Sequence, residues 1–140
     1  MAPTLSAIGA HGGGTRGTGR RGILAIVACV ALLAGCAESP DGAQAFHWLN
    51  ESLVDGKVEL LKPELLMFEP QPNGSMQLIG VDYVVPLTAS ATAPTLLGVP
   101  FARNEPLGVW ALHIWAWRPN PSGMFAAWNP KVSCRYAKTS

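Results

Sequence analysis

One histidine lies in an aromatic stretch near the end of the chain, and its ring could act in two ways. His113 belongs to the run "VWALHIWAW" and shares an expected strand face with four apolar residues, Val109, Ala111, Trp115 and Trp117. A histidine among tryptophans is most often a packed residue with one ring nitrogen hydrogen-bonded. Held on a rigid strand and shielded from water by indoles, the same ring could instead serve as a ligand or a general base.

The tryptophans offer a second kind of chemistry, because an indole ring can stack on sugars and other ligands. Trp110 and Trp128 are the candidates for such stacking. A small domain also needs large aromatic side chains in its core, and we expect Trp115 and Trp117 to be core residues. Trp128 lies in a proline-rich tail and is expected to clamp that tail onto a sheet.

The first part of the chain has the pattern of a secretory signal. Residues 1–21 carry three arginines and no acidic residue, and the apolar run "GILAIVACVALLAGC" follows from Gly22 to Cys36. A basic segment, a short apolar run and small residues at its end are the parts of a signal peptide. The run is shorter than the roughly 20 residues of a membrane-spanning helix. We therefore expect residues 1–35 to be a signal peptide.

The end of this segment, Leu33-Ala34-Gly35-Cys36, resembles the lipobox of bacterial lipoproteins. The resemblance implies cleavage before Cys36, diacylation of its thiol, and acylation of the new amino terminus with a fatty acid such as palmitate. Several acyl chains anchor a protein stably where one alone would be marginal. The expected product is a lipoprotein of the cell envelope. In a cell with two membranes, Ala37 after the cysteine resembles the outer-membrane sorting pattern.

Charge and cysteine content limit what the remaining chain can do. Ten cations less three leader arginines leave seven, against nine carboxylates, so residues 36–140 carry a formal charge of −2. No basic patch remains to bind nucleic acid, and the expected partners are the membrane and an unknown small ligand or envelope protein. With Cys29 in the leader and Cys36 acylated, Cys134 has no partner, so we expect no intramolecular disulfide.

The mature chain is long enough for one small domain, which we expect to be α+β and mainly antiparallel β. Residues 36–42 would form a lipidated linker and residues 43–140 the globular domain. Ser39-Pro40-Asp41 could cap a helix, and apolar residues recur at helical spacing after it, so we expect one or two short helices, one of them near 43–54.

Asn73-Gly74 lies between two apolar runs and predicts a β-hairpin, because both residues tolerate positive φ. The strands are expected near Leu65–Glu69 and Gln77–Val85. In the second strand, Asp82 is expected on one face. The opposite face would carry the alternating apolar residues Ile79, Val81, Tyr83 and Val85.

Two further strands follow. Thr95–Val99 is a candidate for a short edge strand. Val109–Trp117 is rich in aromatic and branched residues and apolar on both faces, which predicts a central or doubly covered strand. Beyond Arg118, closely spaced prolines and a glycine predict an irregular covering tail.

Several motifs between His47 and Cys134 resemble those of an uncharacterised family of exported bacterial proteins. The motifs are "HWLN", "LVDG", "PELLMFEPQPNG", "LIGVDYVVP", "LHIWAW" and "NPSGMFAAWNPKVSC". The family has no established activity, so the resemblance implies export and no particular reaction. Its members extend further at the N-terminus and have a cysteine before the His-aromatic-x-Asn element. This chain lacks that extension and its cysteine, so Cys134 has no such partner. The resemblance also implies that the His-aromatic-x-Asn element lies in a loop or strand instead of the helix near 43–54.

The family pattern singles out His47, Asp82 and His113. Two imidazoles and a carboxylate could bind a divalent metal such as zinc, with open positions for water or substrate. Metal-activated water would then permit hydrolysis. The three residues are far apart in sequence, so such a site requires that they face one another in the fold. Otherwise Asp82 would pair with a surface cation or orient a histidine.

Glu64 and Glu69 are weaker candidates, expected to be solvated at a strand edge. Nucleophilic catalysis has no support, because the chain lacks a G-x-S-x-G elbow and nothing near Cys134 in sequence would activate its thiol. The leading hypothesis is a lipid-anchored envelope protein without catalysis, acting as a binding or structural module. The alternative is a metal-dependent, hydrolase-like envelope enzyme that uses His47, Asp82 and His113.

Overall fold

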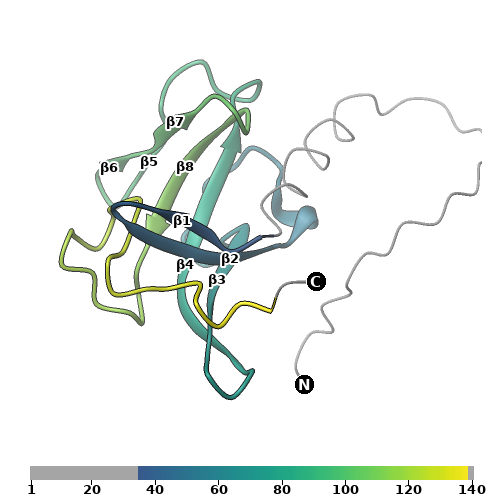
Figure 1. The fold of residues 1–140 in the computed structure, drawn as a ribbon. Coiled ribbons are helices and arrows are strands. Elements are labelled where there is room, and N and C mark those ends of the chain that lie inside the picture. The colour runs from purple at the N-terminus through teal and green to yellow at the C-terminus, as the bar shows by residue number, and fades with distance from the viewer. Residues whose placement is uncertain (1–34, 139–140) are drawn as a thin grey trace, which may run out of the picture.

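The computed structural model describes residues 35–138, which fold into a curled antiparallel sheet with a small hairpin beside it (Figure 1). The expected signal peptide, residues 1–35, lies outside the described residues except for Gly35. In spatial order the six strands of the main sheet are β1 (Ala37–Ser39), β2 (Gly42–Leu49), β3 (Leu65–Pro70), β4 (Met76–Pro86), β8 (Val109–Ile114) and β7 (Ala102–Asn104). The hairpin consists of β5 (Thr95–Leu96) and β6 (Val99–Pro100). The prediction of a mainly antiparallel β domain is confirmed.

The β3–β4 hairpin forms as predicted around Asn73-Gly74. Gly74 adopts a φ of 83°, its N–H donates to the carbonyl of Gln71 at 2.9 Å, and Asn73 Oδ1 accepts from the backbone N–H of Ser75 at 2.9 Å. A bulge opposite Met67 and Phe68 interrupts the strand alternation at Ile79. Ile79 therefore packs with Met67 and Trp115 rather than with Val81, which corrects the expected grouping of β4 side chains.

The expected helix near 43–54 is wrong, because residues 42–49 form strand β2. Alternate residues of this strand point inward, and these are Ala43, Ala45, His47 and Leu49. Period-two burial against β3 outweighs the helical spacing of a few apolar residues. Among the described residues the helical content is one 3₁₀ turn, Glu51–Leu53, in which Asn50 Oδ1 accepts from the N–H of Ser52 at 3.2 Å.

Strand β8 is central, as predicted, with β4 on one side and β7 on the other. Its two faces border different apolar clusters. The cluster on the outer face of the β4–β8 pair consists of Val81, Tyr83, Val85, Phe101, Trp110, Leu112 and Ile114. The inner face carries two smaller clusters, one around Met67, Ile79 and Trp115 and one of Leu65, Val84 and Val109. The strand ends at Ile114, three residues before the predicted end.

The tail after β8 is irregular and covers one end of the sheet, as its prolines predict (Figure 1). The N–H of Trp115 donates to the carbonyl of Met124 at 3.0 Å, and its indole N–H donates to that of Ala126 at 2.7 Å. Asn129 and Ala43 exchange two backbone hydrogen bonds of 3.1 Å, which ties the tail to β2.

Gly42 makes this last contact possible. It has a φ of 126°, and a Cβ at this position would collide with the backbone of Asn129. Trp128, next to the bridge, is half-buried, and its carbonyl accepts from the side chain of Asn120. The expectation of a core position is confirmed for Trp115 and wrong for Trp117, whose exposed fraction is 55%.

Cys134 is not alone. It forms a disulfide with Cys36 across a sequence separation of 98 residues, with their Cα atoms 5.7 Å apart. The prediction of no intramolecular disulfide is therefore wrong. Its error lay in setting Cys36 aside as a tethered lipid attachment point, whereas residues 37–39 pair with β2 and hold Cys36 within the fold. Among the described residues, no helix has the length and hydropathy needed to span a bilayer.

Candidate metal centre

His47, Asp82 and His113 come together on the inner face of the sheet, from strands β2, β4 and β8. Asp82 and His113 lie directly opposite each other in the β4–β8 register. His47 lies one strand further away, opposite Met67 of β3. Neighbouring strands are about 4.8 Å apart, so in a flat sheet β2 and β4 would be separated by roughly 10 Å. The curl of the sheet and the length of the imidazole side chain close this gap.

The ligand atoms of the three residues lie within 4.8 Å of one another. Asp82 Oδ2 is 3.8 Å from His47 Nε2 and 3.5 Å from His113 Nε2. These separations exceed the ~2.7–3.2 Å of a good N–H···O hydrogen bond. The 3.5 Å separation is close to the edge of a tetrahedral zinc site, about 3.4 Å for bonds of about 2.1 Å, and the 3.8 Å separation is longer than this edge. The group could therefore hold a metal ion.

Each of the three side chains has a buried polar atom without a hydrogen-bond partner. These atoms are His47 Nδ1, Asp82 Oδ1 and His113 Nε2. Buried polar atoms in folded proteins almost always have a partner, because leaving one unpaired costs about 1–3 kcal/mol. Of the three, only His113 Nε2 is also one of the atoms that face one another across the group, because His47 and Asp82 face it with Nε2 and Oδ2.

Burial sets the protonation states of the group. It lowers the pKa of His47 and of His113 to about 4, since desolvation disfavours the imidazolium. It raises the pKa of Asp82 to about 6, while the charge attraction of His47 acts in the opposite direction. At pH 7 both rings are therefore neutral and the carboxylate is ionised, and these are the forms that bind metal ions.

Apolar side chains enclose the group on both sides. The Met67 cluster lies at one end, with the indole of Trp115 stacked near the ring of His113 at a centroid distance of 6.4 Å. The cluster of Leu65, Val84 and Val109 lies at the other end. The side-chain exposed fractions are 2% for His47, 5% for Asp82 and 11% for His113. His113 is thus the member of the group nearest to solvent.

Glu64 and Glu69 are buried, so the expectation that both are solvated is wrong. Glu64 Oε2 accepts from the N–H of Val84 at 3.1 Å, and burial raises the pKa of Glu64 to about 7. Glu69 lies at the far end of β3, where its carboxylate is 3.2 Å from the guanidinium of Arg118 and accepts from the N–H of Ser133. Glu69 ties the tail to the sheet, while Glu64 adds a second buried carboxyl on the Asp82 side of the core.

The two stacking candidates are differently placed. Trp110 is buried in the outer cluster, its indole N–H donates to the carbonyl of Ser90 at 3.0 Å, and the guanidinium of Arg103 lies 5.2 Å from its ring centroid. Little of the Trp110 ring surface is therefore exposed for a ligand to stack on. Trp128 is partly exposed and lies beside the Ala43–Asn129 bridge.

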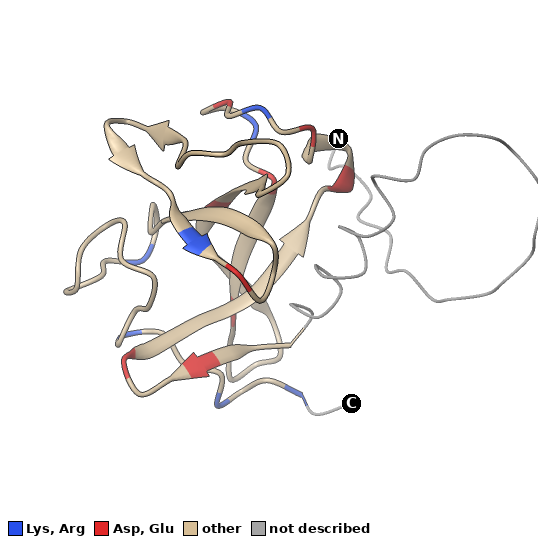
Figure 2. Ribbon diagram, turned by 90° about the horizontal axis from the view of Figure 1, so that it is seen from above, with Lys and Arg blue, Asp and Glu red and all other residues tan. Residues whose placement is uncertain are grey.

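Lys, Arg, Asp and Glu positions are scattered along the ribbon of the described residues in Figure 2. Three of the cations have a carboxylate nearby in sequence, in the pairs Lys57–Asp55, Lys62–Glu59 and Arg103–Glu105. Such exposed pairs contribute little to stability.

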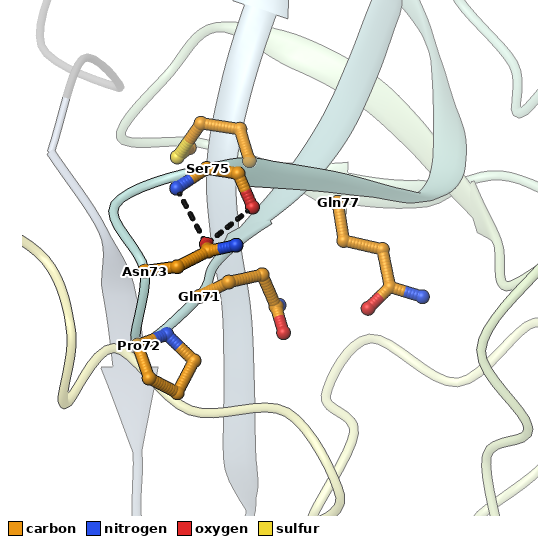
Figure 3. A pocket seen from close by; sticks show the side chains of 6 residues that line it. Gln71, Pro72, Asn73, Ser75 and Gln77 are labelled. Atoms are coloured by element: carbon orange, nitrogen blue, oxygen red, sulfur yellow. Dashed lines mark hydrogen bonds between the residues drawn. The ribbon is translucent and has the colours of Figure 1, made fainter.

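An open depression lies over the β3–β4 turn (Figure 3). It is lined by Gln71, Pro72, Asn73, Ser75, Met76 and Gln77. These side chains come from neighbouring positions of one turn, and Asn73 and Ser75 bond to each other. The depression contains none of the candidate residues and lacks an ionisable side chain, so it carries no chemistry of the kind that the metal centre offers.

Sequence reasoning missed two parts of this arrangement. The disulfide had a signal in the two cysteines at the ends of the mature chain, Cys36 and Cys134, but the lipobox interpretation obscured it. The burial of Glu64 had only the weak signal of a carboxylate directly before an apolar strand.

Searches against protein-family models, curated proteins and solved structures found no match to this chain.

Proposed function

We propose that this chain is an exported bacterial envelope protein whose β domain binds one divalent cation, with zinc as the best fit. The carrying observation is the geometry of His47, Asp82 and His113. Their ligand atoms are too far apart for hydrogen bonds and at the right separation to share an ion. Two imidazole nitrogens and a carboxylate oxygen are a common donor set for zinc.

The enclosure of the group favours a structural or storage role over catalysis. Structural zinc sites are closed, whereas catalytic sites keep a position open to water and substrate. All three side chains are close to fully buried, and apolar clusters flank them. The metal-dependent hydrolase remains the second candidate. It is supported by the same donor set and by the residual exposure of His113, through which a fourth ligand such as water would have to enter.

Export is supported by the basic and apolar segments that precede Cys36 and by a disulfide, which forms and persists in oxidising compartments. Two features of Cys36 favour different final locations within the envelope. The lipobox favours a membrane-attached form, with the lipid on Cys36 as the contact to the membrane, and the disulfide favours a released form.

Metal content decides the binding proposal. The full chain is expressed with its leader, and the processed protein is purified, stripped with a chelator and titrated with zinc by calorimetry. We expect one zinc per chain and a rise in melting temperature with zinc concentration, since a ligand that binds only the folded state stabilises it.

Asp82→Asn is the test variant and Asp41→Asn is its matched control, because Asp41 lies exposed in the β1–β2 turn. Asp82→Asn should abolish stoichiometric binding, whereas Asp41→Asn should bind as the wild type does. Wild-type protein that is folded but takes up no zinc, manganese, iron or cobalt would exclude a metal centre. Retained binding in Asp82→Asn would place the metal elsewhere.

A further inference from the structure

Cys36 is part of the folded domain. Its sulfur is bonded to that of Cys134, and strand β1 begins at the next residue, Ala37. Residues Ala37–Ser39 pair with β2, with a register shift between Ala37 and Glu38, and the Ser39 hydroxyl accepts from the N–H of Asp41 within the turn. Cys36 is therefore fixed by its neighbours and does not hang on a free linker.

The C-terminal tail that carries Cys134 is held beside Cys36 by contacts of its own. The N–H of Cys134 donates to Glu38 Oε1 at 2.8 Å, so the strand that follows Cys36 holds the backbone of its partner. Both cysteines pack against the inner cluster that contains Met67 and Val132. The Ala43–Asn129 bridge fixes the tail to β2 a few residues away. Independent contacts on both chain segments thus bring the two sulfurs together.

Lipidation and the disulfide exclude each other, because both use the sulfur of Cys36. Acylation at a lipobox forms a thioether between this sulfur and a diacylglyceryl group. A thioether sulfur has no thiol proton to lose and cannot join a disulfide. A chain lipidated at Cys36 would leave Cys134 as a free thiol against the inner cluster.

We propose that Cys36 is a disulfide cysteine in the mature protein, and that the chain is released into the exported compartment and not held there by lipid. The two thiols lose two protons and two electrons to a disulfide-bearing thiol oxidoreductase. The reaction passes through a mixed disulfide and leaves the oxidoreductase as a dithiol. This inference rests on the proposed export and is independent of the proposed metal.

The test uses the full chain in a bacterial host with lipoprotein-processing enzymes, grown with an alkyne-bearing fatty acid. Cells are fractionated, free thiols are blocked with an alkylating reagent, and the processed protein is analysed by mass spectrometry without reduction. The wild type should lack the lipid label, take up no alkylating reagent, and yield a peptide pair joined through Cys36 and Cys134 that separates on reduction.

Cys134→Ser removes the competing thiol, and Cys36→Ser is its matched control. In Cys134→Ser the freed Cys36 should gain lipid label and the protein should move to the membrane pellet, while Cys36→Ser should remain unlabelled. Wild-type protein with lipid on Cys36 and a free Cys134 thiol would overturn the inference while leaving export intact. Wild-type protein retained in the cytoplasm with its leader uncleaved would instead overturn export.

Discussion

Asp82 lies opposite His113 on adjacent strands, with Asp82 Oδ2 3.5 Å from His113 Nε2, yet the two side chains do not hydrogen-bond. A cross-strand pair at this distance normally closes into a hydrogen bond when both groups are buried, because neither can turn to water. His47 approaches the same oxygen from the other side at 3.8 Å. The proposed shared ion would account for two rings that lie close to the carboxylate without a hydrogen bond to it.

Removing the charge of Asp82 should stabilise the metal-free protein at high pH. Burial raises the folded-state pKa of Asp82 from 3.8 to about 6. The protonated form is therefore favoured in the fold. Protonation of Asp82 therefore stabilises the folded state relative to the ionised form. This stabilisation is complete below pH 3.8 and is lost as pH rises through 6. With chelator present, Asp82→Asn should exceed the wild type by about 1–3 kcal/mol in unfolding free energy at pH 8.

Chemical denaturation at pH 8 and pH 4 measures this effect, and the advantage of Asp82→Asn should shrink toward pH 4. The exposed Asp41→Asn is the control and should show little change at either pH. If Asp82→Asn were less stable than the wild type at pH 8, the ionised carboxylate would be a net stabilising group without any metal.

Zinc affinity should depend on pH in a way that reflects these pKa values. Above about pH 6.5 the three ligands already have their metal-binding forms, so affinity should be nearly constant. Below pH 6 zinc must displace a proton from Asp82, and affinity should fall about tenfold per pH unit. The two histidines take up protons, and thereby weaken zinc binding further, only near pH 4. A solvent-exposed pair of histidines would begin to lose zinc near pH 6.5 with twice this slope, and that result would contradict the buried site.

Gly80→Ala should damage the fold beside the metal centre. A Cβ at Gly80 would lie 2.5 Å from the carbonyl oxygen of Ile114 and 2.6 Å from Met67 Cε, so the β4–β8 pair would have to shift. We expect a loss of about 1–3 kcal/mol from overpacking and weaker zinc binding, because Asp82 is two residues away. Gly98→Ala is the control, since its Cβ meets nothing within 4 Å and only its φ of 76° is strained. Equal losses in the two variants would argue against a tight contact at Gly80.

The ion pair between Arg118 and Glu69 should matter more than the exposed pair between Arg103 and Glu105. Glu69 is buried, with an exposed fraction of 6%, so Arg118→Met leaves a carboxylate without its cation. The expected loss is about 1–3 kcal/mol, lowered from the value of a fully buried pair because Arg118 is partly exposed. Arg103→Met should cost less than about 1 kcal/mol. Thermal unfolding of both variants compares them, and a larger loss at Arg103 would contradict this ranking.

The disulfide should supply much of the stability of this small domain. A cross-link that closes a loop of about 100 residues stabilises a fold by roughly 4–5 kcal/mol in the chain-entropy description. We expect the double variant Cys36→Ser/Cys134→Ser to lose about this amount and to be insensitive to reductant. The wild type should lose a similar amount when reduced. A reduced wild type as stable as the oxidised one would show that the tail contacts alone hold the ends together.

Local patterns predicted the elements that depend on neighbouring residues. Asn73-Gly74 predicted the hairpin, and the apolar run Val109–Trp117 predicted the central strand, which ends at Ile114. Elements that depend on distant contacts were misjudged. Strand β2 is stabilised by pairing with β3, which lies sixteen or more residues further along the chain, and this partner was not visible in the spacing of Phe46 and Leu49.

The same limit applies to the candidate site. The identities of His47, Asp82 and His113 came from a motif resemblance, and the sequence could not tell whether they face one another. Their convergence depends on the register of three strand pairings and on the bulge at Ile79. The low pKa values of the two histidines follow from their burial, which exists only in the assembled fold. No short segment of sequence carries this information.

The Cys36–Cys134 bond turns nearly the whole described chain, residues 35–138, into one covalent ring. A protease that cuts a loop anywhere between the two cysteines would open the ring into a single linear piece without releasing a fragment. All strands of a cut protein would therefore stay in one covalent chain, and the strands on either side of the cut could pair again with β3 and β4. A single cut between the two cysteines would therefore nick the domain without separating it into two pieces.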